Sequence, residues 1–277
     1  MKRTSARSSN IEDRRGQRRV KKGFSGGGLG TIILIFAALF FGFNPLSFLG
    51  GGEQQQESAP TSQQDIAAGE FVSQVLQQTE DVWAKIFGDI GQRYREPTLV
   101  LFSGATTSAC GHAQAAMGPF YCPGDQKVYI DTVFYNELSQ KFGAKGDFAQ
   151  AYVVAHEVAH HVQTLLGLSE RVNSMKAQSG KSKANELSVR FELQADCLSG
   201  VWAHNTHKQT QTLEQGDIEE ALRAAAAIGD DAIQRKTQGY VVPDSFTHGT
   251  GKQRAYWFME GFRAGQVNSC DTFSNNI

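Results

Sequence analysis

The stretch YVVAHEVAHHV (152–162) decides how this chain is expected to fold. Its first two histidines, His156 and His160, are four residues apart, and residues with that spacing lie on one face of an α-helix. Glu157 follows the first of them. The flanking residues are apolar, so the helix is expected to pass through a core, where unpaired polar side chains are costly. A metal ion would give both imidazoles a partner, and the pattern therefore predicts a buried metal-binding helix.

The surrounding sequence predicts a mainly helical domain of the α+β class with a small β-sheet. Asp147 is a good N-cap and Gly167 a good terminator, which predicts a helix over 148–166. Further helices are expected at 66–91, 184–203, 217–228 with an extension to 235, and 252–265. A buried strand is expected at 98–102, a second strand or hairpin around 120–130, and a polar loop at 174–183.

A catalytic zinc site usually has three protein ligands and one position open to water. An extended motif with a third histidine six residues after His160 is excluded, because Leu166 stands there. Glu192 and Asp196 share one face of the next long helix. Glu192 is the predicted third ligand, with Glu186 as the reserve. Asp196 is expected to accept a hydrogen bond from a ligand histidine and to set its tautomer.

These residues predict hydrolytic chemistry of a zincin-like kind. Zinc lowers the pKa of a water molecule and polarises a carbonyl group, and Glu157 is placed to act as the base. A donor to the developing oxyanion is also needed. His248, in a glycine-containing loop before the last helix, is the first candidate for this catalytic role. Tyr121 and Tyr129 are weaker alternatives. His161 points away from the metal face and is interpreted as a packing or hydrogen-bonding residue.

The charge of the chain is uneven. The 277 residues carry a net charge of −1, with 40% hydrophobic and 20% charged residues, which is ordinary for a globular protein. Residues 1–30, however, hold nine Lys/Arg against Glu12 and Asp13, a net +7 that leaves −8 for the rest. A basic arm on an acidic body is typical of nucleic-acid contact or of a cytoplasmic anchor beside a membrane span.

The next segment favours the membrane. Residues 31–43 read TIILIFAALFFGF, and the stretch to residue 49 is about long enough for a helix to cross a bilayer. A cleaved signal peptide and a buried core helix are the rival interpretations. The positive-inside rule then predicts a single-pass protein with a cytoplasmic N-terminus and an exported catalytic domain, periplasmic or extracellular. The expected organisation is a basic arm (1–30), an anchor (31–49), a flexible linker (50–65) and a catalytic domain (66–277). No nucleic-acid partner is expected.

Four cysteines in an exported chain indicate disulfides. Three pairings can be drawn, and we favour Cys110–Cys122 for a local loop and Cys197–Cys270 for the C-terminus. The alternatives are four buried thiols, or a second zinc site in which His112 joins Cys110 and Cys122.

Several motifs together resemble a known family. They are GPFYCPGDQKVYID (118–131), HEVAHHVQ (156–163), FELQADCLSG (191–200), THGTGKQRAYWFMEGF (247–262) and CDTF (270–273). The chain is similar to the bacterial neutral zinc metallopeptidases, membrane-anchored relatives of gluzincin-type peptidases. The resemblance implies zinc ligands at His156, His160 and Glu192, and Glu157 as catalytic base. It implies no particular substrate.

The expected function is therefore zinc-dependent cleavage of peptide bonds, with a peptide or protein as substrate. The alternative is a catalytically silent, membrane-anchored module that keeps zinc for stability and acts in binding or as a chaperone. Retention of Glu157 favours the peptidase, because a structural zinc site needs no base and usually fills its fourth position. The oligomeric state is not predicted by any pattern in the sequence.

Overall fold

The structure, a computed structural model, describes residues 1–16, 63–114, 118–141, 143–275 and 277. The predicted anchor (31–49) and nearly all of the predicted linker lie outside these residues. Within them, no helix combines the length and the apolar character that a membrane crossing requires.

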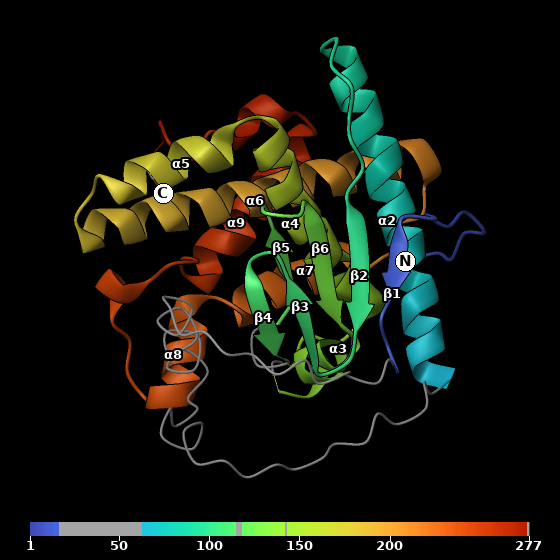
Figure 1. Cartoon of the computed structure of the whole chain (residues 1–277), viewed down its shortest axis with the longest axis horizontal. Coiled ribbons are helices and arrows are strands. Elements are labelled where there is room, and N and C mark those ends of the chain that lie inside the picture. The colour runs from blue at the N-terminus through green and yellow to red at the C-terminus, as the bar shows by residue number, and fades with distance from the viewer. Residues whose placement is uncertain (17–62, 115–117, 142, 276) are drawn as a thin grey trace.

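Helices make up most of the described chain (Figure 1). They are α2 (Gln63–Asp89), α3 (Thr132–Gln140), α4 (Asp147–Leu165), α5 (Leu168–Ala177), α6 (Lys181–Thr210), α7 (Asp217–Ala227), α8 (Asp230–Gln238) and α9 (Gly251–Ala264), with short 3-10 helices η3 (Pro243–Ser245) and η4 (Val267–Cys270). The predicted α+β class, mainly helical with a small sheet, is confirmed.

The main sheet has four strands in the order β1 (Ile11–Asp13), β2 (Thr98–Phe102), β6 (Lys127–Asp131) and β5 (Phe120–Cys122). β1 and β6 both run parallel to β2, whereas β5 pairs antiparallel with β6. A separate hairpin joins β3 (Ala105–Ser108) to β4 (Gly111–Gln114). β5 and β6 also contact α4, so the sheet lies against the helix that carries the histidines.

Several helix predictions need correction. The polar stretch 174–183 is not one loop, because α5 continues to Ala177 and α6 begins at Lys181. The segment 217–235 is not one helix either: it breaks at Gly229, whose missing Cβ lets the main chain of Gly251 approach closely. Gly146, rather than Asp147, is the N-cap of α4. Strands β1, β3 and β4 and helix α3 were not predicted.

α6 is the central helix of the domain. It packs against α4 on one side and against α9 on the other, and it is buried from Leu193 to Ala203. Gly200 of α6 lies against the main chain of α9, and Gly261 of α9 lies against the main chain of α6. The disulfide Cys197–Cys270 joins α6 to η4, and Cys110–Cys122 joins the turn between β3 and β4 to β5, so the favoured pairing is confirmed.

Candidate metal centre

α4 presents two imidazoles to one point. His156 and His160 lie one turn apart, and their ring centroids are separated by 4.8 Å. The neighbouring residues Ala155, Val158 and Ala159 are almost fully buried, which explains why the helix passes through the core at this point. The local sequence thus places both rings on one buried helical face, as predicted.

α6 brings a carboxylate to the same point. Glu192 Oε2 lies 3.1 Å from His156 Nε2 and 3.5 Å from His160 Nε2. One ligand atom from each of the three residues lies within 4.8 Å of the others. Two imidazole nitrogens and one carboxylate oxygen are the donor set of a catalytic zinc site with three protein ligands. The residues present therefore fit the predicted ion.

The charges at this point favour a cation. Burial by itself raises the pKa of the Glu192 carboxyl, but the imidazoles of His160, His248 and His156 bring it well below its ordinary value. Burial lowers the pKa of His156, yet Asp196 and Glu192 raise it to about 10. The field that stabilises a proton on this imidazole would also stabilise a metal ion in its place.

Glu157 lies beside His156 on α4 and is only 8% exposed. Burial raises the pKa of its carboxyl, and the two neighbouring imidazoles oppose that rise. A carboxylate with a raised pKa accepts a proton more readily than an exposed one does, which suits a general base.

Asp196 fixes the ring of His156 by a hydrogen bond to Nδ1, the nitrogen that faces away from Glu192. His156 Nδ1 lies 2.9 Å from Asp196 Oδ1, so the ring presents Nε2 toward Glu192. Tyr152 also donates to Asp196 Oδ1. Asp196 is completely buried and one helical turn beyond Glu192. The predicted hydrogen bond between Asp196 and one of the two histidines is present, and it fixes both the tautomer and the orientation of the His156 ring.

Arg254 of α9 completes this network and was not predicted. Its Nε and Nη2 donate to the two oxygens of Asp196 at 2.9 and 3.0 Å, and Nη1 donates to the carbonyl of Ile228 at 3.2 Å. Arg254 is 3% exposed. A buried arginine needs a carboxylate partner. The signal in the sequence was the charged Arg254 itself, which stands just before the apolar aromatic residues Trp257 and Phe258. The guanidinium lowers the pKa of Asp196 against the opposing effect of burial.

His160 has its own support. Its Nδ1 pairs with Gln163 Oε1 at 2.8 Å, while Gln163 Nε2 donates to the carbonyl of Phe191 and to Gln194 Oε1. The ring also stacks on Phe191. Gln163 and Gln194 were not predicted to take part. The two imidazoles are thus each oriented by a side-chain partner: His156 by Asp196 of α6, and His160 by Gln163 of α4, which is itself bound to α6.

His248 lies close to the metal centre on the loop before α9. Asp230, fully buried at the start of α8, accepts the backbone N–H groups of Thr247, His248 and Gly249 at 2.7, 2.6 and 3.0 Å. The other oxygen of Asp230 lies 3.3 Å from His248 Nδ1. Burial lowers the pKa of His248, but the charges of Glu192 and Asp230 raise it overall. The ring therefore lies in the field of the Glu192 carboxylate, and its side chain remains 42% exposed.

Other candidates lie elsewhere or have other partners. Glu186 pairs with Lys183 and Arg190 on the outer side of α6, so the reserve third ligand is not at the centre. His161 Nε2 donates to the carbonyl of Arg95, and its Nδ1 pairs with the hydroxyl of Tyr121, which confirms its interpretation as a hydrogen-bonding residue.

Two further alternatives are excluded by contacts. Tyr129 donates its hydroxyl to Asp125, away from the metal centre. The suggested second zinc site is wrong, because Cys110 and Cys122 are joined in a disulfide.

A second acidic group, Asp147 with Asp217, contacts the α-ammonium of Met1 at 2.6 and 3.1 Å.

Comparison with known proteins decides the family. A family model described as "Putative neutral zinc metallopeptidase" matches residues 1–273. The chain belongs to this metallopeptidase family. Family membership agrees with the resemblance seen in the motifs and supports zinc-dependent peptidase chemistry in general.

Two relatives of this chain are each named as an uncharacterized protein. The Uncharacterized protein YpfJ of Escherichia coli K12 is 47% identical over 280 residues, covering 98% of this chain and 97% of the relative. The Uncharacterized protein Rv2575 of Mycobacterium tuberculosis H37Rv is 48% identical over 191 residues, covering 65% of this chain and 64% of the relative. No solved structure matches the chain.

Proposed function

We propose that this protein cleaves peptide bonds with a zinc ion held by His156, His160 and Glu192. The observation that carries the proposal is the convergence of three ligand atoms from α4 and α6 within 4.8 Å, beside the buried carboxylate of Glu157. Two features favour a catalytic over a structural ion. Only three candidate ligands of the described chain converge there, and Glu157, an acid that is not among them, stands next to them.

The side chains divide the chemistry between them. A bound zinc ion supplies Lewis-acid polarisation of the scissile carbonyl and a water molecule of lowered pKa. Glu157 accepts the proton of the attacking water and delivers it to the leaving amine. Asp196, supported by Arg254, keeps the His156 ring in the orientation that presents Nε2.

His248 is the proposed donor to the developing oxyanion. Asp230 binds both the loop main chain and Nδ1 of the ring, so the imidazole is held close to its place before substrate arrives. A preoriented donor is worth more than a mobile one, because no reorganisation is needed during the reaction. Its raised pKa favours the protonated, donating form.

The test compares the purified full chain with Glu157→Gln in cleavage of casein and of a peptide library. We expect a loss of activity of at least about a hundredfold, because general-base catalysis contributes about 10²–10⁴. Glu186→Gln, on the exposed side of α6, is the matched control and should cleave normally. Zinc content should be unchanged in both. Equal cleavage by Glu157→Gln and the wild type would reject the mechanism and favour the silent binding or chaperone module.

Membrane association through residues 31–49 is part of the proposal. It rests on the apolar character of that stretch, which lies outside the described residues. A peptide or protein is the proposed substrate, and cleavage-site profiling with the peptide library would define its class. The side of the membrane on which the catalytic domain resides depends on how the N-terminal residues are placed.

A further inference from the structure

Residues 1–16, here called the N-terminal segment, form a strand of the catalytic sheet. β1 pairs with β2 in parallel register, with Ile11, Glu12 and Asp13 opposite Leu99, Val100 and Leu101. Two further hydrogen bonds bracket the pairing: Leu99 N–H donates to the carbonyl of Asn10, and Arg14 N–H donates to the carbonyl of Leu101, both at 2.8 Å. Figure 1 shows β1 in blue beside β2, on the side that faces α2.

The N-terminal segment also supplies partners for buried polar groups of α2. Gln74 is completely buried; its Nε2 donates to the carbonyl of Lys2 at 3.0 Å, and its Oε1 accepts Thr4 N–H at 3.1 Å. Glu80, 4% exposed, accepts Ser8 Oγ at 2.7 Å and Asn10 Nδ2 at 2.9 Å. These are specific contacts that a loosely tethered arm would not make.

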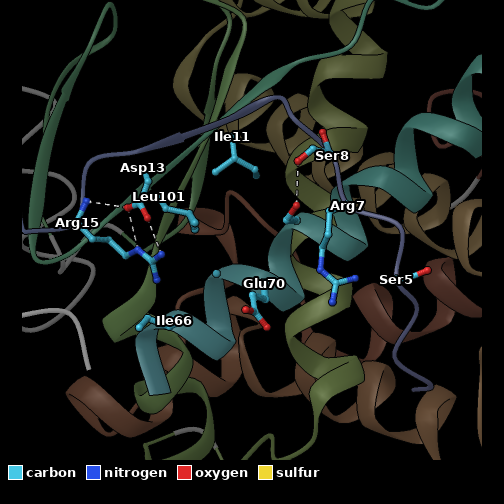
Figure 2. Close-up of a pocket in the computed structure, with 11 residues that line it drawn as sticks. Ser5, Arg7, Ser8, Ile11, Asp13, Arg15, Ile66, Glu70 and Leu101 are labelled. Carbon is cyan, nitrogen blue, oxygen red and sulfur yellow. Dashed lines mark hydrogen bonds and ion pairs between the residues drawn. The ribbon is translucent and has the colours of Figure 1, made fainter. Parts of the chain in front are cut away.

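Charged side chains of the N-terminal segment also contact the domain. Arg3 lies 4.0 Å above the ring of Phe71, and Arg14 lies over Tyr129. Glu12 pairs with Lys127 at 2.7 Å. Figure 2 shows where the segment arches over the first turns of α2, with Ser8 and Ile11 turned toward the helix and Arg15 paired with Asp13. The predicted basic arm is thus, over residues 1–16, a docked segment.

β2 has the composition of a central strand. Its sequence TLVLF is a continuous apolar run, and Leu99, Val100 and Leu101 are at most 1% exposed. Without β1 this strand would be the edge of the sheet, with unpaired backbone groups beside apolar side chains, which is an aggregation hazard. The domain needs the N-terminal segment to cover that edge.

We propose that the N-terminal segment and the domain formed by residues 63–277 reside in the same compartment as one folded unit. The chain from 17 to 62 must then begin and end on one side of any membrane that it contacts. A single crossing by residues 31–49 would separate β1 from β2, so single-pass topology and the docked segment cannot hold together. The conflict remains if two copies exchange their N-terminal segments, because in every copy the segment would still lie across the membrane from the domain.

Protease access in sealed vesicles tests the proposal on the full chain. One epitope is inserted after residue 20 and another is added after Ile277, and both right-side-out and inverted vesicles are digested. We expect both epitopes to be lost from the same face, or to be recovered together in the soluble fraction. Loss of the two epitopes from opposite faces would overturn the proposal.

A cysteine pair tests the docking directly. Ser8 and Ser73 are joined by two hydrogen bonds, Ser8 N–H to the carbonyl of Ser73 at 3.1 Å and Ser73 Oγ to the carbonyl of Ser8 at 2.9 Å. In full-length S8C/S73C with a protease site inserted after residue 50, we expect the cleaved N-terminal fragment to stay attached to the domain on a denaturing gel until reduction. S8C and S73C alone are the controls and should release it on the same gel. Release from the double variant after oxidation of the isolated vesicles would contradict the docking. Neither readout uses peptidase activity, so this proposal and the proposed function can fail separately.

Discussion

One carboxylate, Asp196, links three helices behind the metal centre. It accepts from His156 and Tyr152 of α4 and from Arg254 of α9, while it belongs to α6. All four residues are buried. The position of His156 Nε2, the proposed zinc ligand, therefore depends on Asp196, and the strength of zinc binding should depend on Asp196 too.

Asp196→Asn is expected to weaken zinc binding by about 10–100-fold, because the amide is a poorer acceptor for His156 and leaves Arg254 without its charge partner. Competition with a chromogenic chelator measures the affinity. Glu186→Gln, the same chemical change on the exposed side of α6, should bind zinc as the wild type does. Equal affinities of Asp196→Asn and Glu186→Gln would show that Asp196 has no orienting role.

Glu80 should make stability depend on pH. Burial raises the pKa of its carboxyl above that in the unfolded chain, in spite of the hydrogen bonds from Asn10 and Ser8. The folded state therefore binds the proton of Glu80 more tightly than the unfolded state does. The stabilisation that this proton gives to the folded state is present below the unfolded pKa and is lost as pH rises through the folded pKa. Glu80→Gln removes the titration but keeps an acceptor oxygen.

We expect the free energy of unfolding of Glu80→Gln, relative to the wild type, to increase between about pH 4 and about pH 7. Urea unfolding at several pH values measures this difference, and comparison with the wild type cancels the titration of all other groups. A difference that stays constant or falls over this range would mean that Glu80 has no raised pKa.

At the scale of elements, the crossing of α6 and α9 sets the distance between Asp196 and Arg254. A Cβ atom on Gly200 would lie 2.0 Å from the carbonyl oxygen of Phe258, and one on Gly261 would lie 1.8 Å from that of Cys197. Real Cβ atoms do not approach backbone so closely, so the two helices can meet only where both carry glycine.

Gly200→Ala and Gly261→Ala are each expected to lower the free energy of unfolding by about 3 kcal/mol, because the helices must move apart. Zinc binding should weaken in both, since α9 would carry Arg254 away from Asp196. Gly88→Ala in α2 is the control: nothing lies within 4 Å of the new atom, and a gain of about 0.5–1 kcal/mol is expected. Thermal and urea unfolding provide the measurements, and similar behaviour of all three variants would reject the close crossing.

At the scale of the whole molecule, two disulfides restrict the unfolded chain to different degrees. Cys110–Cys122 spans 12 residues, and Cys197–Cys270 spans 73. Loop-closure entropy predicts stabilisation of about 3 kcal/mol for the first and about 4 kcal/mol for the second. The second also joins α6, which carries Glu192, to the C-terminal η4.

Cys197→Ala/Cys270→Ala is therefore expected to lower the unfolding midpoint more than Cys110→Ala/Cys122→Ala does. The long-range pair should also lose more zinc affinity, because Cys197 directly follows Asp196 on α6. Urea unfolding of the two double variants gives the comparison. A greater loss from the Cys110/Cys122 variant would show that native-state contacts, rather than chain entropy, dominate.

The sequence by itself determined those features that depend on local spacing. The helical period places His156 and His160 on one face, the ligand number of zinc requires a third donor, and Glu192 with Asp196 repeats the same spacing on a later helix. Helix ends at glycines and apolar runs for buried strands are local in the same way. The α+β class and the convergence of His156, His160 and Glu192 were accordingly predictable.

Only the tertiary structure decided which distant groups become partners. Arg254 reaches Asp196 across 58 residues, and Asp230 reaches His248 across 18. β1 is three residues long and lies in a polar, basic stretch of the sequence, so the local pattern predicts an exposed arm. It becomes a strand because the apolar edge of β2 and the buried Gln74 and Glu80 need partners. Periodicity describes one element at a time, whereas pairing depends on which unsatisfied groups meet after the chain has folded.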